Sequence, residues 1–406
     1  MNRSLLLQDA IRQGAATHTS LPVLAKGFRP FFLLAALYAV VMVPLWLGII
    51  NGKLAPSSYL EPAAWHAHEM TWGFVVAVIA GFLLTAVGNW TQRETATGAT
   101  LAGLALLWLA GRLAMLLAAV LPRGLPAVLD LAFLPALGFV LARPLLVAKS
   151  RRNFVMLGVL AALFAANLVV HLDGLGVLPP GSARYANLVS VDVIVLLIMV
   201  IGGRVFPVFT RNATGVASIR NIPWLDQASV IAMVALVLVD ASMPNAVRLG
   251  AILAGLVGIL AAARAVHWGA RHSWRDPLVW VLHAGYGWLV VGLLLRGTAG
   301  VLGWPFGSVA THALTVGAIG TLTLGMMARV SLGHTGRMLV APGPMTAAFV
   351  GITLAAFARV LVPWVSPEHY TVGLFAAGAF WVLAFVVFLL AYAKILWRPR
   401  MDGRPG

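Results

Sequence analysis

Apolar residues in this chain come in long runs, separated by short stretches that contain Pro, Gly and Asn. A helix rises about 1.5 Å per residue, so about twenty apolar residues cross the hydrocarbon core of a bilayer. Backbone polar groups inside lipid must be satisfied internally, and the ten-residue alternation of a transmembrane β-barrel is missing from the sequence. The pattern therefore predicts membrane-spanning helices at 28–50, 65–87, 99–120, 125–148, 153–171, 183–207, 224–241, 245–267, 277–299, 304–330, 345–365 and 370–396.

The loops between these runs are too short to hold a soluble domain. The sequence therefore predicts an all-α polytopic membrane protein, with about twelve helices in a single bundle. We expect a cytoplasmic segment at 1–27, a transmembrane domain at 28–396 and a cytoplasmic tail at 397–406. The first 27 residues are not expected to be a cleaved signal peptide, because no small-residue cleavage site follows a short apolar core.

Composition and charge agree with a membrane location. The chain is 61% hydrophobic and only 10% charged, and its formal net charge is +16. Most of the 28 Lys and Arg residues fall in segments that share the cytoplasmic side if both termini are cytoplasmic. The charge therefore indicates topology in a bacterial inner membrane and not a nucleic-acid partner. The absence of cysteine excludes disulfides, thiolate metal sites and iron–sulfur clusters.

Polar residues gather where the second span begins, in the segment 65–70 with the sequence WHAHEM. Ionisable groups inside a membrane are costly, so each is a candidate for function. On a regular helix, His66, Glu69 and Met70 share one face, and His68 points almost the opposite way. One metal ion is therefore not expected to bind both histidines.

Further polar residues lie in the ninth and tenth spans. His312 is expected near the outer end of the tenth span, and His334 at its cytoplasmic end. His283 and Tyr286 lie three residues apart in the ninth span and so face the same way. Neutral imidazole is a suitable ligand for haem iron and for copper. Three arginines are candidates to pair with the anionic haem propionates: Arg204, Arg329 and Arg337.

Each of these features has a simpler interpretation. Arginines at a span end can extend their head groups to the interface, and a lone histidine there is usually an interfacial residue. We expect this simpler role for His18, His171, His267, His272 and His369. Four histidines buried in three spans are harder to explain in this way, and together they favour a bound cofactor.

Motifs along most of the chain occur in an order that is specific as a set. They are Gly27–Phe32, Trp65–Met70, Gly81–Ala86 ahead of Asn89-Trp90, Gly202–Val205, Phe209–Asn212, Pro277-Leu278, His283 with Tyr286, and His312–Arg337. This set resembles the NnrS family of haem- and copper-containing bacterial membrane proteins. One departure is Gly88, which stands where proline is expected before Asn89-Trp90.

The resemblance implies twelve spans, bound haem and a role in nitric oxide metabolism or resistance to nitrosative stress, and it leaves copper open. The family's histidine positions fall on His66, His68, His283, His312 and His334. Nitric oxide or a similar diatomic molecule is the implied ligand, and the implied electron donor is a membrane or periplasmic one. The resemblance does not distinguish an oxidoreductase from a non-enzymatic haem sensor.

The leading hypothesis assigns His68 and His312 as axial ligands of one haem, with His66 and Glu69 beside it. His283, Tyr286 and His334 would form a second polar or metal site near the cytoplasmic face. Glu69 or Tyr286 would donate protons if nitric oxide is reduced. The alternative is a proton-coupled secondary transporter that uses Asp130, Asp192 and Asp240. It ranks second because the two halves lack corresponding helices broken by Gly or Pro.

Overall fold

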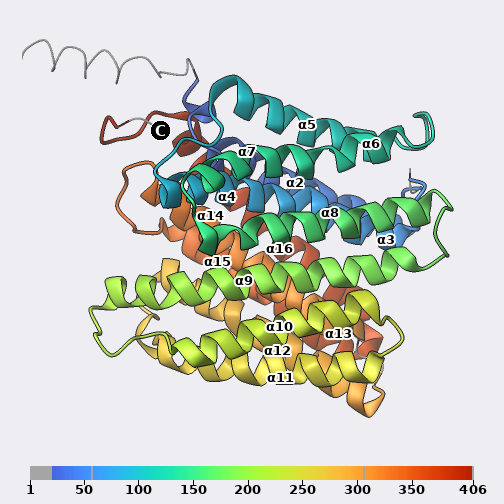
Figure 1. Cartoon of the computed structure of the whole chain (residues 1–406). Helices are drawn as coiled ribbons and strands as arrows, with labels where there is room; N and C mark the ends of the chain where they lie inside the picture. The colour runs from blue at the N-terminus through green and yellow to red at the C-terminus, as the bar shows by residue number, and fades with distance from the viewer. Residues whose placement is uncertain (1–20, 56–57, 305–306, 405–406) are drawn as a thin grey trace, which may run out of the picture.

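The computed structural model describes residues 21–55, 58–304 and 307–404. These residues form helices, turns and loops, with no strand among them (Figure 1). Most of the predicted cytoplasmic segment 1–27, including His18, lies outside the described residues.

Twelve helical spans in the described chain are long and apolar enough to cross a membrane. Six are single helices, and the other six include an additional short segment. The spans are α2 (Phe28–Ile50), α3 to α4 (Pro62–Thr91), α5 (Gly98–Leu116), α6 to α7 (Leu125–Val147), α8 with the turn before it (Arg151–Gly174), α9 (Ser182–Thr214), α10 (Pro223–Ser242), α11 with the turn after it (Val247–Trp268), α12 (Pro277–Leu302), α13 to α14 (Gly307–Gly333), α15 (Gly343–Val365) and α16 with the turn before it (Pro367–Trp397). The predicted number and order of spans are confirmed.

Local sequence signals set several of these boundaries. Asp276 caps α12 by accepting a hydrogen bond from the backbone N–H of Leu278 at 2.9 Å, and Pro277 occupies the first helical position, where a backbone N–H is not needed. The same helix ends at Gly303, which adopts φ = 70°. Glycine tolerates this left-handed conformation without strain, so it stops the helix there.

The second and tenth spans form the interior of the bundle, because more of each is buried than of any other described span. Both spans are irregular in the same way. A short helix, α3 (Pro62–His68) or α13 (Gly307–His312), ends at a histidine and continues as a π-helical segment, Glu69–Val75 or Ala313–Gly320. Figure 1 shows α3 and α13 at the same end of the bundle. The histidines of both spans therefore lie at one end of the molecule.

Candidate cofactor site

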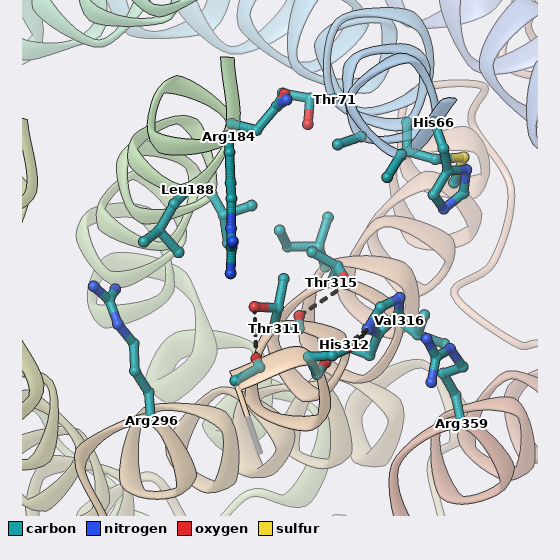
Figure 2. A pocket seen from close by; sticks show the side chains of 18 of the residues that line it. His66, Thr71, Arg184, Leu188, Arg296, Thr311, His312, Thr315, Val316 and Arg359 are labelled. Carbon is teal, nitrogen blue, oxygen red and sulfur yellow. Dashed lines mark hydrogen bonds between the residues drawn. The ribbon is translucent and has the colours of Figure 1, made fainter. Parts of the chain in front are cut away.

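A cavity of about 910 Å³ lies between the second and tenth spans at this end of the bundle. Its walls come from α2, α3, α9, α10, α11, α12, α13, α15 and α16, so it joins segments from both ends of the chain. Most of the lining is apolar, with a few polar groups that point inward (Figure 2). This volume is at the upper end of the range for small-molecule and cofactor pockets, and the mixture of apolar wall and few polar groups is typical of them.

Two of the predicted histidines, His66 and His312, line this cavity. The ring of His66 stacks on Trp46 with a centroid distance of 4.4 Å, and this contact holds the ring in place. The Nδ1 atom of His312 lies 2.7 Å from the backbone oxygen of Ser308. A carbonyl oxygen can only accept, so Nδ1 carries the hydrogen and Nε2 keeps a free lone pair. His312 is therefore prepared as a ligand through Nε2.

Arg359 of α15 lies in the same wall as the two histidines. Its guanidinium is close enough to both imidazoles to act on them electrostatically, and Figure 2 shows it beside His312. The side chain is only 8% exposed and lies over the ring of Tyr370, with 5.6 Å from the guanidinium carbon to the ring centroid. Within the described parts of the chain, no carboxylate forms an ion pair with it. A buried cation without a counter-ion is costly, so this wall favours an anionic ligand.

His68 does not face the cavity. It belongs to a second group of buried side chains on the other side of the same helix, which we call the buried polar cluster: His68, Glu69, Arg112, Asp130, Asn167 and His171. The cluster draws on the second, third, fourth and fifth spans. Each of these side chains is at most 4% exposed.

Hydrogen bonds connect the whole cluster. His68 Nδ1 lies 2.7 Å from Glu69 Oε1, and His68 Nε2 lies 3.1 Å from Asp130 Oδ2 and 3.0 Å from Asn167 Oδ1. His171 Nε2 lies 2.8 Å from the same Asp130 oxygen. Arg112 pairs with Glu69 at 2.9 Å and also contacts Asp130. The positive charge of Arg112 thus stabilises two carboxylates that would otherwise be costly to bury.

Tyr59, in the loop before α3, completes the cluster from the end of the bundle. Burial raises the pKa of the Tyr59 hydroxyl, so this group stays protonated. The Asp130 carboxylate accepts from Nε2 of His171, so Nδ1 of the neutral ring accepts from the Tyr59 hydroxyl. Both ring nitrogens of His68 likewise lie next to acceptor oxygens, so the histidine rings supply the hydrogens for the hydrogen bonds of this network.

Three members of the cluster, His68, Asp130 and His171, can hold a metal ion. Their ligand atoms all lie within 4.8 Å of one another, and all three side chains are buried. Two imidazoles and one carboxylate form a donor set that suits zinc or copper. Binding would displace the protons that now lie between these atoms, so metal affinity at this site should rise with pH.

A comparison with protein families identifies the family of the chain. The model of the NnrS protein family matches residues 22–400, which is nearly the whole chain. The chain belongs to the NnrS family. It is accordingly a multi-pass membrane protein of the nitric oxide response. Among curated proteins, none matches the chain significantly.

The structure separates Glu69 from His66 and Met70, although a regular helix would place all three on one face. His66 and Met70 line the cavity, but Glu69 points into the buried polar cluster. The expectation that these three share one face is therefore wrong for Glu69. The reason is electrostatic, because a buried carboxylate needs a cation and Arg112 lies on the cluster side. Tyr38 contacts the same carboxylate and holds it there.

The other predicted site residues of this NnrS-family chain do not line the cavity. Arg204 donates to Asn153 at 2.9 Å, Arg337 donates to the backbone oxygen of Thr335 at 3.3 Å, and the guanidinium of Arg329 lies 4.0 Å from the ring centroid of Phe209. All three are thus engaged elsewhere in the protein. The arginines that do line the cavity are Arg184, Arg296 and Arg359.

The predicted second site is also not assembled in the described structure. His283 shares a hydrogen bond of 2.9 Å with Thr210, and Tyr286 packs on Trp268 with a centroid distance of 4.6 Å. His334 instead packs against Phe28. Burial, with the charges of Arg400 and Lys26 nearby, lowers the pKa of His334 and keeps it neutral.

Sequence reasoning missed four members of the two sites: Arg112, Asn167, His171 and Arg359. His171 is only 1% exposed and bonded to Asp130, so its expected interfacial role is wrong. Arg359 stands alone in a long apolar run, and an isolated charge within a span is a signal that could have identified it. The carboxylate partners of Arg112 come from two other spans, which no local pattern reveals.

Proposed function

We propose that this protein binds haem in the cavity through His66 and His312, and that nitric oxide binds or is converted at the haem iron. The single observation that carries the proposal is Arg359, a buried cation beside two histidines in a cavity of cofactor size. An apolar pocket with imidazole ligands and a guanidinium that has no carboxylate partner among the described residues matches the chemistry of haem, which is flat and apolar and carries anionic propionates.

The residues have distinct roles in this proposal. His66, held by Trp46, and His312, fixed by Ser308, would provide nitrogen ligands from opposite spans. Arg359 would pair with a propionate, and Arg184 reaches into the same cavity from α9 (Figure 2). When bound, the haem would supply an iron atom that binds nitric oxide. The assignment of His66 in place of His68 follows from the side of the helix on which each lies.

A second metal would fit the buried polar cluster. We propose copper at His68, Asp130 and His171, because this donor set suits it and the three ligand atoms already converge. The protein would act in the bacterial inner membrane, with electrons from a membrane or periplasmic donor if nitric oxide is converted. A non-enzymatic sensor would use the same haem site without that donor.

The test is haem binding by purified variants. His66→Ala and His312→Ala should each lose most of the haem, measured from the optical spectrum and the iron content of the same sample. His283→Ala, at a histidine outside the cavity, is the matched control and should keep its haem. Full haem content in both His66→Ala and His312→Ala would refute the site. A well-folded wild-type protein that takes up no haem would refute the proposed function.

A further inference from the structure

A third group of charged side chains lies in the cavity wall, away from the two histidines. Arg296 of α12 donates from one nitrogen to both carboxylate oxygens of Asp192 on α9, at 2.8 and 3.0 Å. Its other terminal nitrogen contacts Asp240 of α10. We call Asp192, Asp240 and Arg296 the aspartate–arginine triad. Asp240 and Arg296 both line the cavity.

The formal charges of the triad do not balance. Two carboxylates share one guanidinium, and the exposed fractions of the side chains are 0% for Asp192, 12% for Asp240 and 16% for Arg296. Asp192 and Asp240 contact the two terminal nitrogens of one guanidinium, so their carboxylates are held close together. Like charges held close together in a buried place favour a proton on one of the two carboxylates.

The surrounding helices do not supply a second cation to the triad in the described chain. On α11, Arg264 pairs with Asp226 and Arg248 is exposed. Arg184 on α9 is also exposed, and no ion pair joins it to either aspartate. A net negative charge in this setting is costly, and a bound proton removes it at no steric cost.

The triad borders the cavity through Asp240 and Arg296. A Cβ atom placed on Gly250 would lie 2.7 Å from Asp240 Oδ1, so the backbone of α11 closes tightly over this carboxylate. Asp192 is fully buried and does not line the cavity, whereas Asp240 does. Asp240 is therefore the carboxylate through which the triad can exchange a proton with the contents of the cavity.

We propose that the aspartate–arginine triad binds one exchangeable proton, shared between Asp192 and Asp240, and presents it to the cavity. When the carboxyl O–H bond breaks, the proton passes to water or a ligand in the cavity, and Arg296 stabilises the carboxylate left behind. A proton donor to bound nitric oxide is the role that would follow, and that role alone rests on the proposed function. The proton site itself does not depend on haem.

The experiment is infrared spectroscopy of the full-length protein at neutral pH, with hydrogen–deuterium exchange. We expect a carbonyl-stretch band from one protonated aspartate that shifts on exchange into D₂O. Asp192→Asn and Asp240→Asn should each remove this band, and Asp276→Asn, at the cap of α12, should leave it unchanged. A band that survives both triad variants would overturn the proposal.

Labelling with ¹³C-aspartate keeps the test valid if a variant fails to fold. The band of the wild-type protein should shift with this label, and the absence of a labelled protonated band would overturn the proposal. Haem content is measured on the same samples. The band without bound haem would support the proton site and count against the proposed function. Bound haem without the band would support the proposed function and overturn the proton site.

Discussion

Replacing Arg359 by methionine should change cofactor affinity and protein stability in opposite directions. Arg359 is 8% exposed and has no carboxylate partner among the described residues, so the cofactor-free protein carries the cost of a buried charge. Methionine removes this charge and keeps an unbranched, flexible side chain that replaces the apolar stem of the arginine. We expect the cofactor-free variant to be more stable by roughly 1–2 kcal/mol, at the low end for a buried ion because Arg359 borders the cavity.

The same substitution should weaken haem binding. A hydrogen bond to a charged group contributes about 1.5–3 kcal/mol, and a tenfold change in affinity corresponds to about 1.4 kcal/mol. Loss of the contact between Arg359 and a propionate should therefore raise the Kd for haem roughly 10- to 140-fold. Arg359→Lys keeps the charge but lacks the planar guanidinium, so its Kd for haem should lie between those of Arg359→Met and the wild type.

Two measurements check this prediction. Haem is titrated into the cofactor-free protein in detergent and followed by absorbance, and thermal unfolding is recorded before haem is added. Arg143→Met, at an exposed arginine on α7, is the matched control and should change neither quantity. Unchanged haem affinity in Arg359→Met would refute a role in anion binding. Reduced stability of the cofactor-free variant would refute the inference that this cation is unpaired.

Two further predictions concern stability alone. Arg112→Met should destabilise the protein by about 3–5 kcal/mol, because Glu69 and Asp130 lose the cation they share. Adding Glu69→Gln to this variant should restore part of the lost stability, as measured by thermal unfolding. A single variant as stable as the wild type would contradict the observed ion pairs. Gly297→Ala should cost about 1–3 kcal/mol, because its Cβ would lie 2.7 Å from the Gly255 Cα atom and push α12 away from α11. Gly287→Ala on the same helix meets nothing within 4 Å and should be neutral or slightly stabilising in the same assay; equal losses in both would refute the packing argument.

The spans could be predicted from the sequence because each depends on a local property. A run of apolar residues must cross the membrane as a helix whatever its neighbours are, so the twelve predicted spans agree with those observed. The histidines in the second and tenth spans could be identified for the same reason, since a polar group in an apolar run stands out. The predictions were weakest for which side chains contact one another, because these contacts depend on how the spans pack.

The choice between His66 and His68 illustrates this limit. Their sequence spacing correctly placed them on opposite faces of the helix, but it could not show which face borders the cavity. That depends on Arg112, Asp130 and His171, which come from three other spans and gather around His68. The prediction for the arginines has the same limit, because Arg204, Arg329 and Arg337 have suitable chemistry but lie away from the cavity.

The two π-helical segments link the fold to the site. Glu69–Val75 and Ala313–Gly320 begin directly after His68 and His312, in the two most buried spans of the described chain. π-helical turns are rare, and they are frequently found at functional sites. Two of them at the same end of the bundle, each next to a histidine, would have no explanation in a protein that only packed its helices. A cavity that must present histidines from facing spans gives both irregularities one cause, because each wide turn shifts the helix after it and leaves room between the spans.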